Sequence, residues 1–287
     1  MKSSEPPGAE VPDSWDEEGW ARFGGRDYEA AVPRPRLTMA ATVEPKPVEW
    51  LWRPRIPQGA LVLLDGHPDT GKSTITLDLA ARLSKGQRMP DGRPGSFGAT
   101  LLLSTEDSLA RPVKERLEAA GAELSMIYGL EVEDPGEMDA RTLVFPHDAA
   151  LLHHAIVQTN ALLVVIDPIM GHIAGDLSAN SDQDVRRALN PLVRIASATG
   201  ATILMVRHLR APERKTKEVP NFLEGGGSKG GFGIVRAGLV AMADADDPTL
   251  RTLHVTKANY GERGRPIDYI FVPSDVNAVA RIRWLPR

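Results

Sequence analysis

Residues 66–73, Gly-His-Pro-Asp-Thr-Gly-Lys-Ser, have the types and spacing needed to bind a phosphate chain. Glycines let backbone N–H groups approach phosphate oxygens, and the N-terminus of a following helix favours negative charge. Lys72 can place its ammonium group beside the β- and γ-phosphates, and the Ser73 hydroxyl suits Mg²⁺. The sequence therefore predicts a site for ATP and Mg²⁺ at Gly66, His67, Pro68, Asp69, Thr70, Gly71, Lys72, Ser73 and Thr74.

Acidic residues follow two further apolar runs, and their chemistry complements this loop. Asp167 ends the run Leu-Leu-Val-Val-Ile-Asp, and we expect it to hold Mg²⁺ through water. Glu106 follows the run Leu-Leu-Leu-Ser-Thr, where a carboxylate can deprotonate an attacking water. We expect the neighbouring Asp107 to cap the helix that follows. These residues predict hydrolysis of the bound nucleotide.

The elements that must position these groups alternate along the chain. Apolar runs of the kind found in strands buried on both faces occupy residues 60–65, 99–104, 161–166 and 201–206. Helical patterns occupy residues 71–84, 109–120, 149–158 and 182–198. This alternation predicts an α/β fold with a mostly parallel sheet flanked by helices, and it sets the phosphate loop between a strand and a helix.

The two ends of the chain have a different pattern. After about residue 235, short apolar runs separated by turns predict C-terminal antiparallel strands at residues 238–243, 250–257, 268–272 and 279–285. Residues 1–45 are polar, acidic and rich in proline, and they offer little apolar surface to offset the entropy of ordering. We therefore expect a disordered or extended acidic tail over residues 1–45 and an ATPase domain over residues 46–287.

Composition excludes several classes of protein. The 42% hydrophobic content can build a sizeable core, and the absence of cysteine excludes disulfide scaffolds and thiolate chemistry. No apolar run approaches the roughly 20 residues of a membrane helix, and the N-terminus lacks the apolar segment of a signal peptide. We expect a cytoplasmic protein without a membrane partner. Its net charge of −4 means that any nucleic-acid binding must come from a local basic loop.

The order of phosphate loop, Glu106, Asp167 and a strand ending in Arg207-His208 resembles that of RecA-like ATPases. Three further stretches are similar to the RepA-like hexameric replicative helicases of plasmids and phages: WLWRPRIPQGALVLLDG, NSDQDVRRALNPLVRIASATGATILMVRHLR and VTKANYG. The resemblance covers roughly residues 48–287. It implies a RecA-like P-loop NTPase core that hydrolyses ATP.

The resemblance also implies roles for residues outside the phosphate loop. His208 matches the position that senses the γ-phosphate, although Arg207 beside it leaves open which of the two contacts phosphate. In this group ATP lies between subunits, and cations on the neighbour's C-terminal strands complete the site. Lys257 matches the first of two such positions, Asn259 occupies the second, and Arg236 is the other candidate. The resemblance thus implies a homo-oligomer, specifically a hexamer.

RecA-like motors place two loops at the ring or filament axis, here residues 168–183 and 209–231. The second loop ends in a glycine-rich run and suits the sugar–phosphate backbone of single-stranded DNA, without base readout. Its cations are Arg210, Arg214, Lys215, Lys217 and Lys229. The acidic tail could contact a replication protein.

Three functions are compatible with these sequence features. The favoured one is an oligomeric ATP-driven motor on single-stranded DNA, a RepA-like helicase. The second is an ATP-dependent DNA-binding switch, such as a loader, recombination mediator or regulator, that does not unwind DNA. A small-molecule kinase is disfavoured by Glu106 at a strand end, by the antiparallel C-terminal strands and by the lack of an obvious lid. The sequence does not separate the first two.

Overall fold

The computed structural model describes residues 37–209, 219–220, 230–277 and 279–285. By its internal contacts the chain divides into two units, Met1–Pro47 and Val48–Arg287. The described part of the first unit contains one short 3₁₀ turn, Ala40–Thr42. The extended tail over residues 1–45 stays a prediction, since most of it lies outside the described residues.

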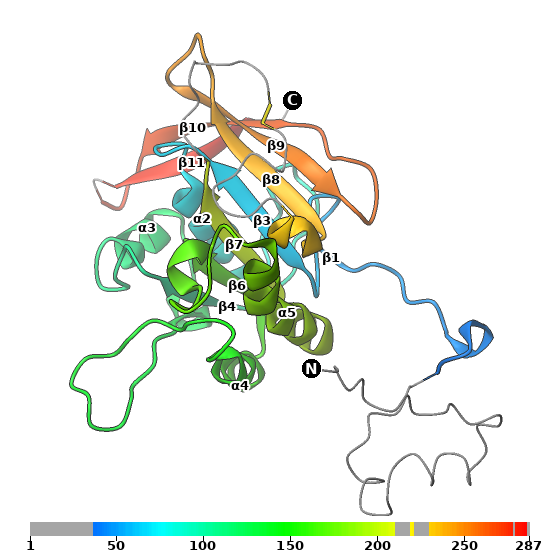
Figure 1. The fold of residues 1–287 in the computed structure, drawn as a ribbon. Helices are drawn as coiled ribbons and strands as arrows, with labels where there is room; N and C mark the ends of the chain where they lie inside the picture. The colour runs from blue at the N-terminus through cyan, green and yellow to red at the C-terminus, as the bar shows by residue number, and fades with distance from the viewer. Residues whose placement is uncertain (1–36, 210–218, 221–229, 278, 286–287) are drawn as a thin grey trace, which may run out of the picture. The chain divides into compact units, whose positions relative to one another are not determined.

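The second unit is built on a sheet whose described strands have the order β11-β10-β9-β8-β3-β7-β6-β4-β5 (Figure 1). Strands β8 to β5 in this order pair in parallel, and β8 to β11 pair antiparallel. The predicted α/β class, with a mostly parallel sheet and C-terminal antiparallel strands, is confirmed. The strands are β3 (Leu61–Gly66), β4 (Ala99–Ser104), β5 (Ile127–Gly129), β6 (Ala161–Asp167), β7 (Thr202–His208), β8 (Ala237–Ala243), β9 (Leu250–Ala258), β10 (Ile267–Pro273) and β11 (Ala280–Leu285).

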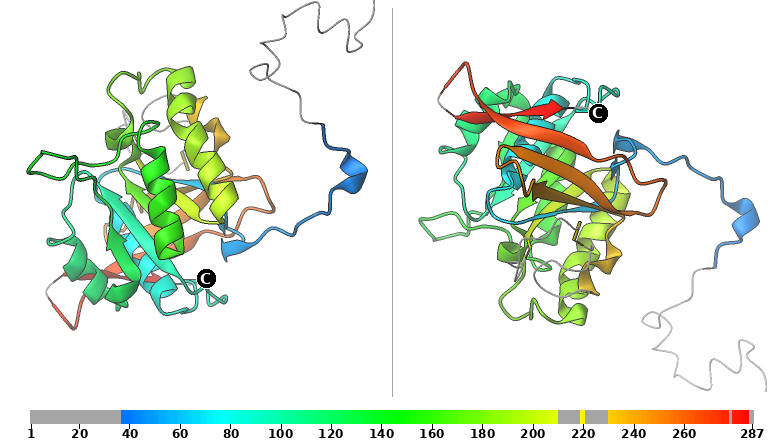
Figure 2. Two further views of the ribbon diagram at one scale, coloured as in Figure 1. Left: turned by 90° about the horizontal axis from the view of Figure 1, so that it is seen from below. Right: turned by 90° about the horizontal axis from the view of Figure 1, so that it is seen from above.

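Helices cover both faces of the parallel part, and a small hairpin of β1 (Trp50–Trp52) and β2 (Ile56–Pro57) precedes it. Figure 2 shows the green helices α4 and α5 in its left view and the orange and red antiparallel strands in its right view. The helices are α2 (Lys72–Ser84), α3 (Val113–Ala119), α4 (Ala149–Thr159) and α5 (Asp182–Thr199). Among the described residues of this unit, the 3₁₀ turns are η3 (Leu124–Met126), η4 (Ile169–His172) and η6 (Gly231–Ile234).

Strand β3 illustrates how the core forms on both faces. Its side chains alternate, so Val62 and Leu64 join the apolar cluster that contains residues of α2 and α3. Leu61 and Leu63 join the opposite cluster, which contains residues of α4 and α5. Because both faces are covered, β3 is apolar throughout, as its sequence predicts.

The sequence predicts a helix over residues 109–120, and the predicted start of this helix is wrong. Helix α3 begins only at Val113. A proline disfavours helical backbone at the residue before it, so Pro112 keeps Arg111 out of the helix. Among the described residues, no helix combines the length and the hydropathy needed to cross a bilayer.

Candidate functional site

The phosphate loop connects the end of β3 with the start of α2, as predicted. Asp69 and Gly71 adopt left-handed backbone conformations, with φ angles of 62° and 83°. A Cβ atom on Gly66 would lie 2.7 Å from the Thr70 hydroxyl oxygen and 2.8 Å from the carbonyl oxygen of Ala241. The close approach of Thr70 and of the Ala241 backbone to residue 66 is therefore possible only because this residue is glycine.

Lys72 lies inside this loop with only 5% of its surface exposed. Its Nζ atom donates to the carbonyl oxygen of His67 at 2.9 Å, and the Thr70 hydroxyl donates to the same oxygen, also at 2.9 Å. Burial lowers the pKa of Lys72, and the charges of Asp167 and Glu106 oppose this effect. An ammonium group stripped of water and facing the loop fits a strongly anionic ligand such as a triphosphate.

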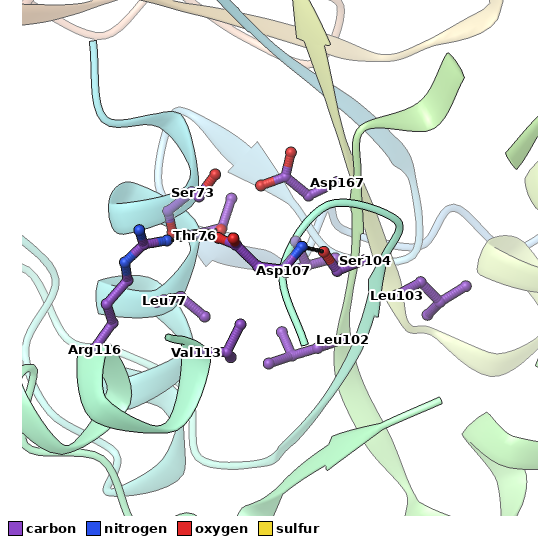
Figure 3. A pocket seen from close by; sticks show the side chains of 11 residues that line it. Ser73, Thr76, Leu77, Leu102, Leu103, Ser104, Asp107, Val113, Arg116 and Asp167 are labelled. Carbon is purple, nitrogen blue, oxygen red and sulfur yellow. Dashed lines mark hydrogen bonds and ion pairs between the residues drawn. The ribbon is translucent and has the colours of Figure 1, made fainter. Parts of the chain in front are cut away.

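Asp167 ends β6 at the same edge of the sheet, with Ser104 of β4 beside it in the pairing register. Burial raises the pKa of Asp167, while a hydrogen bond with Ser73 lowers it. Figure 3 shows Asp167 and Ser73 at one side of a small pocket, with Asp107 and Arg116 near them.

A hydroxyl and a single carboxylate fit Mg²⁺, which takes most of its ligands from phosphates and water. Within the described residues no group of three or more histidine or acidic side chains could hold a metal ion on its own. The donor set of Ser73 and Asp167 is therefore of the kind that binds Mg²⁺ together with a nucleotide.

Glu106 follows β4 and faces the end of β7. One of its carboxylate oxygens lies 3.9 Å from Nε2 of His208. In the register of the parallel strands, His208 stands beside Gly66, the first residue of the phosphate loop. The structure thus brings Glu106, His208 and Lys72 to one edge, as the sequence analysis requires.

The neighbouring Arg207 is oriented differently from His208. It is 1% exposed, and its guanidinium makes two hydrogen bonds with the Asp65 carboxylate, at 2.7 and 2.9 Å. The guanidinium carbon of Arg207 also lies 4.6 Å from the centre of the Phe232 ring. Only His208 of the two lines the cleft beside the phosphate loop.

That cleft is open and has a volume of about 510 Å³, within the range of small-molecule sites. Besides phosphate-loop residues and His208 it is lined by Arg116, Arg251 and Phe271, which the sequence analysis missed. These three come from α3, β9 and β10, and no local motif marks them.

Asp107 does not cap α3, which corrects the expectation for this residue. Its backbone N–H donates to the Ser104 hydroxyl at 3.0 Å, and its carboxylate forms an ion pair with Arg116 at 2.7 Å. The N-cap position of α3 is occupied by Pro112 instead. Because α3 starts six residues later in the chain than Asp107, the carboxylate cannot reach the first N–H groups of the helix as a cap does.

Lys257 and Arg236 lie at the opposite end of the sheet. The N–H of Arg236 donates to Leu61, the first residue of β3, and Lys257 pairs with Gly238. Gly66 lies five residue steps along β3 from Leu61, a distance of roughly 16 Å at about 3.3 Å per step. Neither cation can act on the phosphate loop of its own chain. The Lys257 ammonium donates to the carbonyl oxygen of Gly233 at 2.7 Å.

The proposed DNA-binding cations Arg210, Arg214, Lys215, Lys217 and Lys229 lie outside the described residues. In the first loop, at residues 168–183, His172 is fully buried, and its Nδ1 atom is 2.7 Å from the carbonyl oxygen of Leu143. Burial lowers the pKa of His172. This histidine therefore packs inside the protein and is not a surface contact.

Together, the sheet order, the loop and the groups at its edge define a RecA-like P-loop ATPase domain. Comparison with protein families agrees: a family model described as an AAA domain matches residues 29–214. The chain belongs to this AAA domain family.

Curated relatives are more distant. The chain is 28% identical over 154 residues to the DNA repair protein RadA of Bacillus subtilis (strain 168), covering 53% of this chain and 28% of the relative. The DNA repair protein RadA of Halalkalibacterium halodurans is 28% identical over 153 residues, with the same coverage of 53% and 28%. The chain thus spans little more than a quarter of the length of these relatives. They do not test the resemblance to RepA-like helicases, which stays a prediction.

Proposed function

We propose that this protein is a magnesium-dependent ATPase that acts on DNA. The observation that carries the proposal is the meeting of Lys72, Ser73, Asp167, Glu106 and His208 at one edge of the sheet, beside an open cleft. Lys72 and Ser73 begin α2, just after β3 and the phosphate loop, and the other groups lie at or just after the ends of β4, β6 and β7, so the fold itself brings them together.

The reaction is the attack of water on the γ-phosphorus of ATP. A new bond forms between the water oxygen and phosphorus, the bond to the ADP oxygen breaks, and Glu106 takes the proton that the water loses. Lys72 and His208 are placed to bind phosphate oxygens, which orients the terminal group. Mg²⁺, held by the Ser73 hydroxyl and through water by Asp167, would supply charge neutralisation on the phosphates.

Two measurements test this proposal. Binding of a fluorescent ATP analogue with Mg²⁺ should be lost in Lys72→Ala and retained in Lys85→Ala, which removes an exposed lysine just after the same helix. Release of phosphate should fall about 10²- to 10⁴-fold in Glu106→Gln, the usual range for removal of a general base, with little change in binding. Glu131→Gln, at an exposed glutamate away from the cleft, should leave both unchanged. Equal hydrolysis by Glu106→Gln and wild type would exclude Glu106 as the base.

The action on DNA rests on the named relatives and on the basic residues 210–229. We expect single-stranded DNA to stimulate phosphate release and salt to suppress this stimulation, because contacts with the phosphate backbone release counterions. A variant with Arg210, Arg214, Lys215, Lys217 and Lys229 changed to glutamine should keep its basal hydrolysis and lose the stimulation. Stimulation of this variant equal to that of wild type would remove these cations from the DNA site.

Whether hydrolysis drives unwinding separates a RepA-like helicase from a DNA-binding switch. A strand-displacement assay with ATP, using wild type and Lys72→Ala, decides between them. Displacement by wild type alone supports the motor, while DNA-stimulated hydrolysis without displacement supports the switch.

The distance between the phosphate loop and the pair Arg236 and Lys257 favours a site shared between subunits. If these cations complete a neighbour's site, as in the proposed homo-oligomer, specific activity should rise with protein concentration. Mixing Glu106→Gln with Arg236→Ala should then restore part of the activity, because a mixed pair contains one intact site. No recovery on mixing, together with constant specific activity on dilution, would exclude the shared site.

A further inference from the structure

The C-terminal antiparallel strands contact three consecutive residues of the phosphate loop. The Tyr269 hydroxyl on β10 donates to the carbonyl oxygen of Thr70 at 2.7 Å. Nε of Arg251 on β9 lies 3.4 Å from the carbonyl oxygen of Asp69. The ring of Phe271 contacts Gly71 so closely that a Cβ atom there would lie 2.2 Å from the ring.

These contacts fix the direction of the peptide groups in the loop. In a trans peptide the C=O and the following N–H point in opposite directions. Tyr269 holds the carbonyl of Thr70 toward the strands, which turns the N–H of Gly71 away from them. Arg251 does the same for the N–H of Thr70. Backbone N–H groups are what such a loop offers to phosphate oxygens.

Tyr269 is itself fixed in position by burial and by two aromatic neighbours. It is fully buried, and its ring packs at centroid distances of 5.2 Å from Trp284 and 6.2 Å from Phe271. The indole N–H of Trp284 donates at 2.8 Å to the carboxylate of Asp78, which lies on α2, the helix that follows the phosphate loop. Burial raises the pKa of Tyr269, so its hydroxyl remains a donor throughout the neutral range.

Phe271 is held from its outer side by Arg251. The guanidinium carbon of Arg251 lies 4.4 Å from the centre of the Phe271 ring, in the geometry of a cation–π contact. Arg251 and Phe271 also line the cleft, and both stand outside residues 29–214, which the family model matches.

We propose that Tyr269, Phe271 and Arg251 form a clamp that holds the phosphate loop in its nucleotide-accepting conformation before the nucleotide arrives. Their role is positioning. They make nucleotide binding stronger because the loop loses less conformational freedom on binding. This inference deepens the proposed function and rests on it for the identity of the ligand.

Tyr269→Phe tests the clamp, since it deletes one oxygen atom and keeps the ring. We expect its affinity for a fluorescent ATP analogue with Mg²⁺ to fall about fivefold to tenfold, the size expected for one net hydrogen bond. Arg251→Gln at the surface should lower the affinity in the same direction, and the two effects should combine. The matched control is Tyr260→Phe, at a tyrosine that is 44% exposed, which should bind as wild type does.

A second readout needs no nucleotide. Amide hydrogen exchange of a peptide covering residues 66–76 should be faster in nucleotide-free Tyr269→Phe than in wild type or Tyr260→Phe. A residue that only stabilised the fold would lower the melting temperature and leave both the affinity and this local exchange unchanged. Wild-type affinity and exchange in both Tyr269→Phe and Arg251→Gln would overturn the clamp. Failure of wild type to bind any nucleotide would instead overturn the proposed function, while the exchange measurement still decides on the clamp.

Discussion

Removal of Arg207 should destabilise the protein strongly. Asp65 and Arg207 are neighbours on the parallel strands β3 and β7, and they are 2% and 1% exposed. Burial raises the pKa of Asp65, and the hydrogen bonds and charge of Arg207 lower it. Arg207→Met keeps much of the side-chain volume but leaves a buried carboxylate without its main partner.

Breaking a buried ion pair on one side typically costs about 3–5 kcal/mol, a large share of the roughly 5–15 kcal/mol that stabilises a domain. Loss of the contact between the Arg207 guanidinium and the Phe232 ring, 4.6 Å apart, accounts for part of this cost. Replacing both partners with apolar residues is often nearly neutral, because no unpaired charge remains. The double variant Asp65→Leu with Arg207→Met should therefore lose much less stability than the two single losses combined.

The assay is urea unfolding followed by circular dichroism, at several pH values. A carboxyl whose pKa is raised in the folded state binds a proton on folding, so its destabilising effect shrinks as pH falls through that pKa. The deficit of Arg207→Met should thus narrow as pH falls from neutral. A loss below about 1 kcal/mol, or additive effects in the double variant, would refute the interpretation of this pair.

Three other outcomes follow from the same structure. Burial lowers the pKa of Lys72, so in the nucleotide-free protein its ammonium group loses its charge at a pH below the ordinary lysine pKa of 10.5. Nucleotide affinity should therefore decrease as pH rises through that range, and titrations with a fluorescent ATP analogue at several pH values would show this. Gly71→Ala should abolish nucleotide binding and reduce stability by about 1–3 kcal/mol, since its φ of 83° is strained for alanine and the Phe271 ring fills the space; calorimetry and binding would measure both. Trp284→Phe should cost about 1–3 kcal/mol in urea unfolding by leaving Asp78 without the indole donor, and an unchanged midpoint would contradict that bond.

The parallel part of the fold could be predicted because each of its signals is local. A run such as residues 161–166 is apolar throughout since helices cover both faces of the sheet, and the glycines, Lys72 and Ser73 of the phosphate loop stand within eight residues. Asp167 could be placed for the same reason, since it ends a strand of this kind. In these places the periodicity of the sequence and the local geometry carry the same information.

The remainder of the site depends on contacts between distant parts of the chain. Nothing near Arg251 or Phe271 in the sequence indicates that these residues contact the phosphate loop, Arg251 at Asp69 and Phe271 at Gly71. The role of Asp107 was misjudged because a carboxylate before a helical pattern usually caps it, whereas here Arg116 forms the ion pair with it. The roles of Arg207 and His208 could not be separated either, since only the position of Asp65 shows which side chain is buried.

The topology connects the two ends of the sheet through the segment that carries the basic residues. Strand β7 ends at His208, beside the phosphate loop, and β8 begins at Ala237, beside the start of β3. Both strands run parallel to β3, so residues 209–236 connect the edge of the sheet that carries the phosphate loop to the opposite edge. Their last residue is Arg236, one of the two cations proposed for a neighbour's site. In a ring of such subunits, one covalent segment would therefore join the sensor of one site to the cation of the next. DNA bound to that segment could then affect two sites at once, which predicts cooperative stimulation of hydrolysis by DNA.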